Sequence, residues 1–375
     1  MIEKWETSLT RWVNAGVVDE PTAARVRAFE TEHADSERLR WPTMLALAFG
    51  ALALAAGVLL FVAAHWDDLS PSVRFGLVTG LVASFHLGGA FTEKRFPAMA
   101  MALHAVGTVA LGAGIYLTGQ IFNLAEHWPG GLMLWAIGAA LAWALLRSWP
   151  QAALTAILAP AWLIGEWTDF IEYHQTFRAN QIVPAGIVLL ALVYFTSGDR
   201  NGKVRRALVW IGGIAILPAM LALWFASTET WAYNVAGPLP RSVMMLGWTG
   251  AVGVPLAVAF ALRRAAAWPI VLAAVWVAVA VNLGAVRGEL AMYPWWALGA
   301  TALAAWGVAD ASSERVNVAT AIFAVTLIAF YFSQIMDKIG RSASLMGLGV
   351  LFLAGGWVIE QTRRRLVARA RGAQL

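Results

Sequence analysis

The sequence predicts an all-α protein, a polytopic bundle of transmembrane helices that follows a short N-terminal cytosolic helical hairpin. Composition is the first reason: 60% of the 375 residues are hydrophobic and only 13% are charged, whereas a soluble domain carries about 25% charged residues. The second reason is spacing. Uncharged stretches of roughly 17 to 25 residues, long enough to cross the hydrocarbon core of a bilayer, recur from Met44 to Ile359. The lipid bilayer is therefore the expected surrounding of most of the chain.

Residues 1–40 differ from the rest because they are rich in charge and patterned like two amphipathic helices. Gly16 is a stop signal for the first helix, and Asp19 with Pro21 begins the second. We expect a cytosolic hairpin, for which docking of a protein partner and capping of the first span are both suitable roles. Its expected apolar positions are Leu9, Trp12, Val13, Ala23, Val26 and Phe29.

About twelve spans are expected in a transmembrane domain of residues 41–362, followed by a basic cytosolic tail of residues 363–375. Tryptophans near the expected ends support many of these spans, because indole prefers the headgroup region. The spans are placed at 44–65, 72–91, 98–119, 131–146, 151–167, 182–196, 207–226, 242–262, 266–285, 294–309, 316–333 and 343–359.

The distribution of basic residues predicts the orientation of these spans. With both termini in the cytosol, the inner loops and the tail hold 15 of the 27 Lys and Arg residues, the outer loops hold six, and residues 1–40 hold the other six. Because Lys and Arg in short loops favour the cytosolic side, this is the expected topology. It corresponds to an inner, cytoplasmic membrane.

Several classes of chemistry are not supported by the sequence. The chain has no cysteine, which excludes disulfides and thiolate sites. Its basic residues lie scattered over loops rather than in a folded basic domain, so no nucleic-acid partner is expected. No histidine spacing typical of a metal site, no phosphate-binding GxxxxGK[ST] loop and no GxSxG turn occurs. We therefore predict neither a metal nor a cofactor.

The stretch of residues 114–131 places polar side chains at helical spacing between two apolar runs, at the expected outer face. A polar helix edge must meet water, protein or headgroups, because unpaired polar groups in lipid cost several kcal/mol each. An outward pocket and a merely solvated edge both satisfy this. The first, third and fifth spans end on this face, so the candidate pocket residues are Gln120, Asn123, Glu126, His127, His65, Asp67 and Glu166.

Inside the expected spans, carboxylates are absent except near the ends. A proton pump or a cation-coupled transporter usually places an acid in mid-membrane, so this absence argues against both mechanisms. The intramembrane polar candidates are His86 and His104, toward the cytosolic ends of neighbouring spans. A hydrogen bond between packed helices is the favoured role for such a pair.

Three segments carry a resemblance to a known family: "LTRWVNAGVVDEPTAARVRAFE", "AAHWDDLSPSVRFGL" and "GAGIYLTGQIFNLAEHWPGGLMLWAIGAALAWALLRSWP". They resemble bacterial multi-pass membrane proteins of domain-of-unknown-function family 2157, over about residues 5 to 165. The resemblance implies a bacterial inner-membrane protein. It implies no activity for particular residues.

Three functions fit these observations. The first is binding or transport of a small envelope-associated molecule through the outward polar pocket, and we prefer it. The second is a membrane-embedded enzyme of the cell envelope, which would gather histidines and acids in one water-accessible pocket. The third is a non-catalytic scaffold with a docking hairpin. The sequence favours a protein that is not an enzyme, and it does not identify the ligand.

Overall fold

The computed structural model describes residues 4–37, 69–122, 127–171, 177–199, 202–228, 239–287 and 289–335, and a few single residues between 347 and 361. Every regular element in this part is helical, which confirms the all-α class. The chain divides into two compact units, Met1–Arg74 and Phe75–Leu375. The predicted domain boundary at residue 40 lies outside the described residues, as does the predicted tail of residues 363–375.

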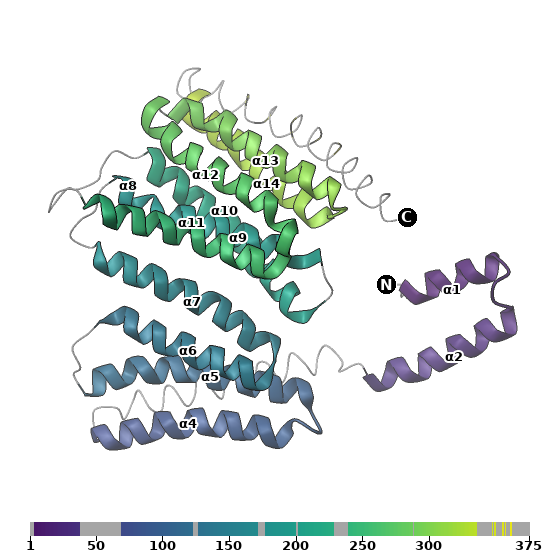
Figure 1. Ribbon diagram of the computed structural model, residues 1–375. Coiled ribbons are helices and arrows are strands. Elements are labelled where there is room, and N and C mark those ends of the chain that lie inside the picture. Colours follow the sequence, from purple (N-terminus) through teal and green to yellow (C-terminus); the bar gives the residue numbers. More distant parts are fainter. Residues whose placement is uncertain are drawn as a thin grey trace. The chain divides into compact units, whose positions relative to one another are not determined.

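The first unit contains α1 (Lys4–Asn14) and α2 (Glu20–Glu37), which run beside each other (Figure 1). Gly16 lies between them with φ +68°, a left-handed conformation that glycine adopts without strain. Leu9 and Ala23 are buried, whereas Trp12 is about half exposed. The N-terminal region is therefore helical, as its pattern indicates, and its assignment as a cytosolic hairpin stays a prediction.

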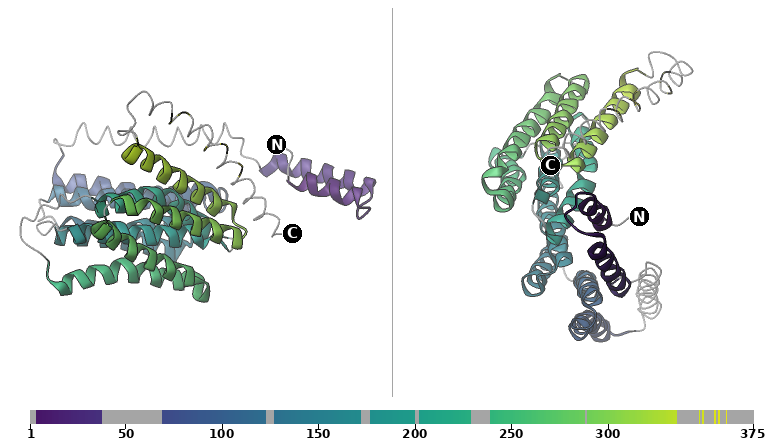
Figure 2. Two further views of the ribbon diagram at one scale, coloured as in Figure 1. Left: turned by 90° about the horizontal axis from the view of Figure 1, so that it is seen from above. Right: turned by 90° about the vertical axis from the view of Figure 1, so that its right-hand side faces the viewer.

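The second unit is a set of helices that lie side by side, as Figures 1 and 2 show. Two short 3₁₀ turns, η1 (Thr196–Asp199) and η2 (Arg264–Ala267), follow α9 and α11, and η3 (Glu289–Ala291) precedes α13. A π-helical turn, Tyr331–Ile335, continues α14. The helices are α4 (Pro71–Thr92, which begins in the first unit), α5 (Pro97–Ile121), α6 (Trp128–Leu146), α7 (Trp149–Phe170), α8 (Phe177–Asn180), α9 (Ile182–Phe195), α10 (Lys203–Thr228), α11 (Arg241–Arg263), α12 (Trp268–Arg287), α13 (Met292–Ala309) and α14 (Ser313–Phe330).

Proline fixes where several of these helices begin. Helices α5, α6 and α7 each carry a proline in the first two positions, at Pro97, Pro129 and Pro150. The first N–H groups of a helix have no partner within it, so proline loses nothing there, and its φ is already helical. The dipeptide Trp-Pro begins α6, α7 and α12, which places an indole at the helix end.

Close packing in the second unit centres on α9. A Cβ on Gly212 of α10 would lie 2.3 Å from the carbonyl oxygen of Ala191, and one on Gly186 of α9 would lie 3.2 Å from the Cα of Ala251 in α11. Glycine thus lets α9 approach both neighbours. Since lipid is as apolar as these side chains, dispersion contacts at such short separations hold the helices together.

Many large apolar side chains of the second unit point away from this packing. Ile214 of α10 and Met245 of α11 are each at least 70% exposed, and Leu145 of α6 is 82% exposed. Water would be a poor solvent for such a surface. Exposed apolar surface is abundant along α4 to α14, which fits a protein that is surrounded by lipid.

Six segments of the described chain are long and apolar enough to cross a membrane: Pro71–Thr92, Pro97–Ile121, Trp128–Leu146, Lys203–Ser227, Arg241–Leu283 and Ser313–Gln334. Segment Arg241–Leu283 contains α11 and most of α12. Each of the ten spans predicted between residues 72 and 333 coincides with one helix, but the count of twelve is not confirmed. The predicted span 44–65 lies outside the described residues, as does all of the predicted span 343–359 except a few single residues.

Length and polarity explain why α7, α9 and α13 are not among these six segments. Helix α9 has 14 residues, about 21 Å at 1.5 Å per residue, against a hydrocarbon core of about 30 Å. Helices α7 and α13 each carry three tryptophans, and α7 also carries Gln151, Glu166 and Asp169. Uncharged composition predicted the helices correctly, and the number of them that cross the membrane stays a prediction.

Candidate functional site

The candidate site is formed where the residue before α6 meets the C-terminal half of α7. The imidazole Nε2 of His127 lies 3.1 Å from a carboxylate oxygen of Glu166, and its Nδ1 lies 3.4 Å from Asp169. The indole N–H of Trp162 donates to Glu166 at 2.8 Å. Trp162, Glu166 and Asp169 lie one turn apart on α7 and therefore share one face of the helix. One histidine thus has a carboxylate at each ring nitrogen.

Glycine and aromatic packing fix the position of His127. A Cβ on Gly165 of α7 would lie 3.1 Å from the indole of Trp128 and 3.3 Å from Pro129. Gly131 packs in the same way on the ring of Tyr116, whose hydroxyl donates to the Trp128 carbonyl oxygen at 3.4 Å. Because α5, α6 and α7 meet at these glycines, the start of α6 has little freedom to move relative to α7.

The three side chains are partly open to solvent, at 57% exposed for His127, 38% for Glu166 and 33% for Asp169. The carboxylates contact opposite nitrogens of the ring, so the three groups do not converge on one point. In agreement with this geometry, no group of three or more His, Asp or Glu in the described part is arranged to hold a metal ion. The arrangement suits hydrogen bonding and binding of a cation at a carboxylate instead.

Only part of the predicted pocket can be located. His127 and Glu166 lie together, and Gln120 is exposed near the C-terminal end of α5. Asn123, Glu126, His65 and Asp67 lie outside the described residues. Asp169 and the indole of Trp162 complete the group, and Trp162 carries no sequence signal beyond its i, i+4 spacing from Glu166.

A second polar group lies within the helices. Nδ1 of His86 on α4 is 3.1 Å from Nδ1 of His104 on α5. The backbone carbonyl of His104 accepts hydrogen bonds from the Gln151 amide of α7 and the Thr108 hydroxyl, at 3.0 and 3.1 Å. The two histidines singled out in the sequence are therefore neighbours across the α4–α5 contact.

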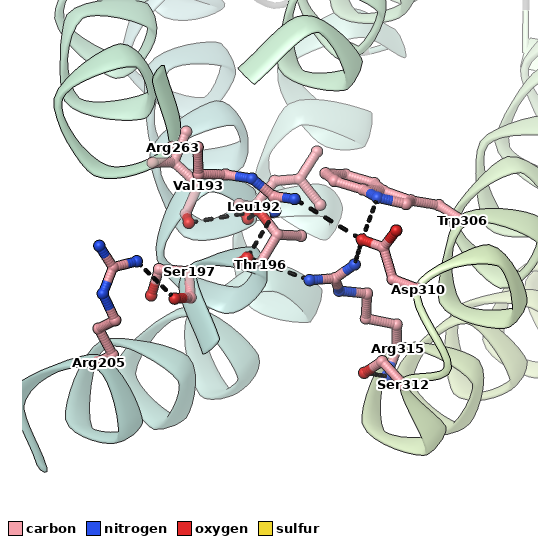
Figure 3. Close-up of polar contacts among 10 residues, drawn as sticks. All are labelled: Leu192, Val193, Thr196, Ser197, Arg205, Arg263, Trp306, Asp310, Ser312 and Arg315. Carbon is pink, nitrogen blue, oxygen red and sulfur yellow. Dashed lines mark hydrogen bonds and ion pairs between the residues drawn. The ribbon is translucent and has the colours of Figure 1, made fainter. Parts of the chain in front are cut away.

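Sequence reasoning missed a cluster of arginines at the opposite ends of the helices (Figure 3). The Thr196 carbonyl oxygen, at the end of α9, accepts hydrogen bonds from Arg263 at 2.6 Å and from Arg315 at 3.1 Å. Asp310, in the α13–α14 turn, is bonded by Arg315 and by the Trp306 indole N–H, and lies 3.6 Å from Arg263.

These arginines tie helix ends together. Arg315 is 2% exposed. The guanidinium groups of Arg315 and Arg263 lie over the Trp306 ring, at 4.9 and 5.1 Å from its centroid. Arg205 bridges the carbonyl oxygens of Ser197 and Leu262. The last carbonyls of a helix lack partners within it and carry partial negative charge, so arginine is well suited to them. The cluster therefore links the ends of α9, α10, α11, α13 and α14, and its role is structural.

Residues 10–152 match the model of a family described as Predicted membrane protein (DUF2157). This match confirms the family resemblance over that part of the chain and, with the apolar helices, supports a membrane location. Comparison with curated proteins and with solved structures gave no match.

Proposed function

We propose that this membrane protein binds a small envelope-associated molecule that carries a basic amine, and that His127, Glu166 and Asp169 form the binding site. In this proposal the site faces the outside of an inner membrane, and both termini lie in the cytosol. The observation that carries the proposal is the placement of one imidazole between two partly exposed carboxylates.

Charge supports a cationic ligand. With a protonated imidazole the three groups sum to one negative charge, and with a neutral imidazole they sum to two. The chain as a whole carries a net charge of +5, so this group is an acidic spot on a basic protein. A local negative potential raises the concentration of cations and speeds their association.

The hydrogen-bonding pattern supports an amine in particular. A protonated imidazole donates one N–H to each carboxylate, and an alkylammonium group, with three donors, can take over either contact. Trp128 borders the site and is 46% exposed, which leaves part of its surface open to a bound cation. A cation over an indole face gains about 0.5–1 kcal/mol at an exposed position.

A ligand can replace the contact between His127 and Glu166 with little loss of free energy. Ion pairs as exposed as His127–Glu166 contribute about 0–1 kcal/mol to stability. A ligand that displaces the imidazole therefore loses little, and a variant that removes one carboxylate should still fold. This separates binding from stability in experiments.

The other two functions make different demands on the same molecule. A histidine beside a carboxylate can also act as a general acid or general base. An enzyme with this site would convert its ligand to a product rather than only bind it. A scaffold would depend on residues 1–40 as the site for a protein partner, and removal of His127 would leave its activity intact. Binding at His127, Glu166 and Asp169 without turnover distinguishes the proposal from both.

Thermal stability in lipid nanodiscs tests the proposal with matched probes. We expect 1,4-diaminobutane and ethanolamine to raise the unfolding temperature, and we expect 1,4-butanediol and succinate to leave it unchanged. Glu166→Gln and Asp169→Asn should each reduce the amine effect, and the double variant should abolish it. Glu93→Gln, which changes an exposed acid in the α4–α5 turn, should keep it. An amine effect that persists in the Glu166→Gln, Asp169→Asn double variant would refute the assignment of the site.

A further inference from the structure

We propose that His86 and His104 form a proton-binding pair that holds a proton between their Nδ1 atoms, at a partly buried position within the α4–α5 contact. This proposal is independent of ligand binding at His127. It begins from the distance of 3.1 Å between the two Nδ1 atoms. Two lone pairs do not approach each other at that distance, so one of the two nitrogens must carry a proton and donate it to the other.

The packing around the pair has an internal symmetry. Each histidine precedes a glycine by three residues, in His86-x-x-Gly89 and His104-x-x-Gly107. A Cβ on Gly89 would lie 2.7 Å from Nε2 of His104, and a Cβ on Gly107 would lie 2.8 Å from Cδ2 of His86. Each imidazole thus rests on the glycine of the opposite helix, and the two glycines set the distance between the rings.

The pair lies within the helices and not at their ends. His86 lies six residues before the end of α4 and His104 seven residues after the start of α5, which places the pair about 9–11 Å from the α4–α5 connection. His104 is 8% exposed. Within the described part of the chain, neither imidazole is paired with a carboxylate or a cation, so the titratable group facing each ring is the other ring.

A buried amide fixes the backbone beside the pair. The amide nitrogen of Gln151, a fully buried residue of α7, donates to the backbone carbonyl of His104. This bond ties α7 to α5 at the position of the pair.

Proton counting defines what the pair can bind. The neutral pair carries two protons on four nitrogens, one of them between the Nδ1 atoms. A third proton, taken from water at a free Nε2, makes one ring an imidazolium that still donates its Nδ1 proton to the neutral partner, and such charge-assisted bonds are about twice as strong. A fourth proton would have to reside on the accepting Nδ1, which would break the bond. The pair therefore accepts one additional proton and no more while the α4–α5 contact persists.

Nitrogen NMR of the full chain in lipid nanodiscs tests this directly, since the chain has only six histidines. With ¹⁵N-labelled histidine we expect a through-hydrogen-bond coupling between the two Nδ1 atoms, and we expect both residues to report uptake of the additional proton as one shared step. His104→Asn should abolish the coupling and shift the titration of His86. Separate midpoints that do not respond to substitution of the partner would overturn the proposal.

Glycine variants supply a test that keeps both imidazoles. Gly89→Ala should displace the His104 ring and remove the coupling, whereas Gly88→Ala, whose Cβ would make an ordinary 3.6 Å contact with Leu103, should preserve it. If Gly89→Ala does not fold, His86→Asn replaces it, and retention of the wild-type His104 titration in that variant would equally refute the pair.

Discussion

The packing of α10 on α9 gives the sharpest quantitative prediction. In Gly212→Ala the new Cβ would lie 2.3 Å from the Ala191 carbonyl oxygen and 2.4 Å from the Phe195 nitrogen. Those two atoms are an i, i+4 pair of α9, so the methyl group meets a backbone hydrogen bond rather than a movable side chain. An ordinary contact needs 3.4 Å, and the difference from 2.3 Å requires the helices to separate by about 1 Å.

Helix α9 cannot move aside freely, because Gly186 already holds it against α11. Overpacking of this kind costs typically 1–3 kcal/mol, and a backbone obstacle places it at about 3. The gain in helix propensity from glycine to alanine, about 1 kcal/mol, leaves a net loss of about 2 kcal/mol. At about 2–4 °C for each kcal/mol, the unfolding temperature should fall by about 4–8 °C.

Intrinsic tryptophan fluorescence during heating in detergent measures this change. The matched control is Gly213→Ala on the next residue, whose Cβ would lie 3.4 Å from the Phe195 ring in ordinary contact. This control should unfold at the wild-type temperature or slightly above it. Equal stability of Gly212→Ala and Gly213→Ala would refute the close α9–α10 packing.

Three further predictions concern the arginine cluster, the topology and the N-terminal unit. Arg315→Met should lower the free energy of unfolding by about 1–3 kcal/mol, because Asp310 and the Thr196 carbonyl oxygen each lose a charged donor. Arg315→Lys should not restore it, since an ammonium lacks the fork that reaches both acceptors. Thermal unfolding measures both variants, and wild-type stability of either one would contradict the cross-linking role. Reporter fusions at the C-terminus and after Trp128 should report opposite sides of the membrane, since Lys and Arg gather on one side; the same side for both would contradict the proposed topology. Deletion of residues 1–40 should leave insertion intact in membrane fractionation, because the apolar segments lie downstream, and loss of insertion at equal expression would show that these residues belong to the membrane fold.

The local sequence predicted where the helices lie, but it did not predict which side chains contact one another across helices. The uncharged runs, with tryptophans near their ends, locate α6, α7 and α12, because a helix in lipid satisfies its backbone within one segment. The contact between Arg315 and the Thr196 carbonyl joins residues 119 positions apart, and no local pattern encodes it. Arginine near a helix end has the same sequence appearance whether it faces water or a carbonyl.

The candidate site was predictable to the extent that topology brings helix ends together. His127 and Glu166 follow from the expectation that the third and fifth spans end on one face. Trp162 was not predicted, although its i, i+4 spacing from Glu166 on α7 lets the indole N–H reach that carboxylate at 2.8 Å. Likewise, the sequence placed His86 and His104 on neighbouring helices, but their glycine contacts depend on the register between α4 and α5.

A structure determined in lipid nanodiscs with saturating 1,4-diaminobutane tests the central claim most directly. The account predicts an amine nitrogen within hydrogen-bond distance of the Glu166 or Asp169 carboxylate, with the His127 imidazole displaced from that carboxylate. It also predicts that these side chains open on the side of the membrane opposite the C-terminus. An unoccupied site with the diamine bound elsewhere, or His127, Glu166 and Asp169 on the same side as the C-terminus, would contradict the account.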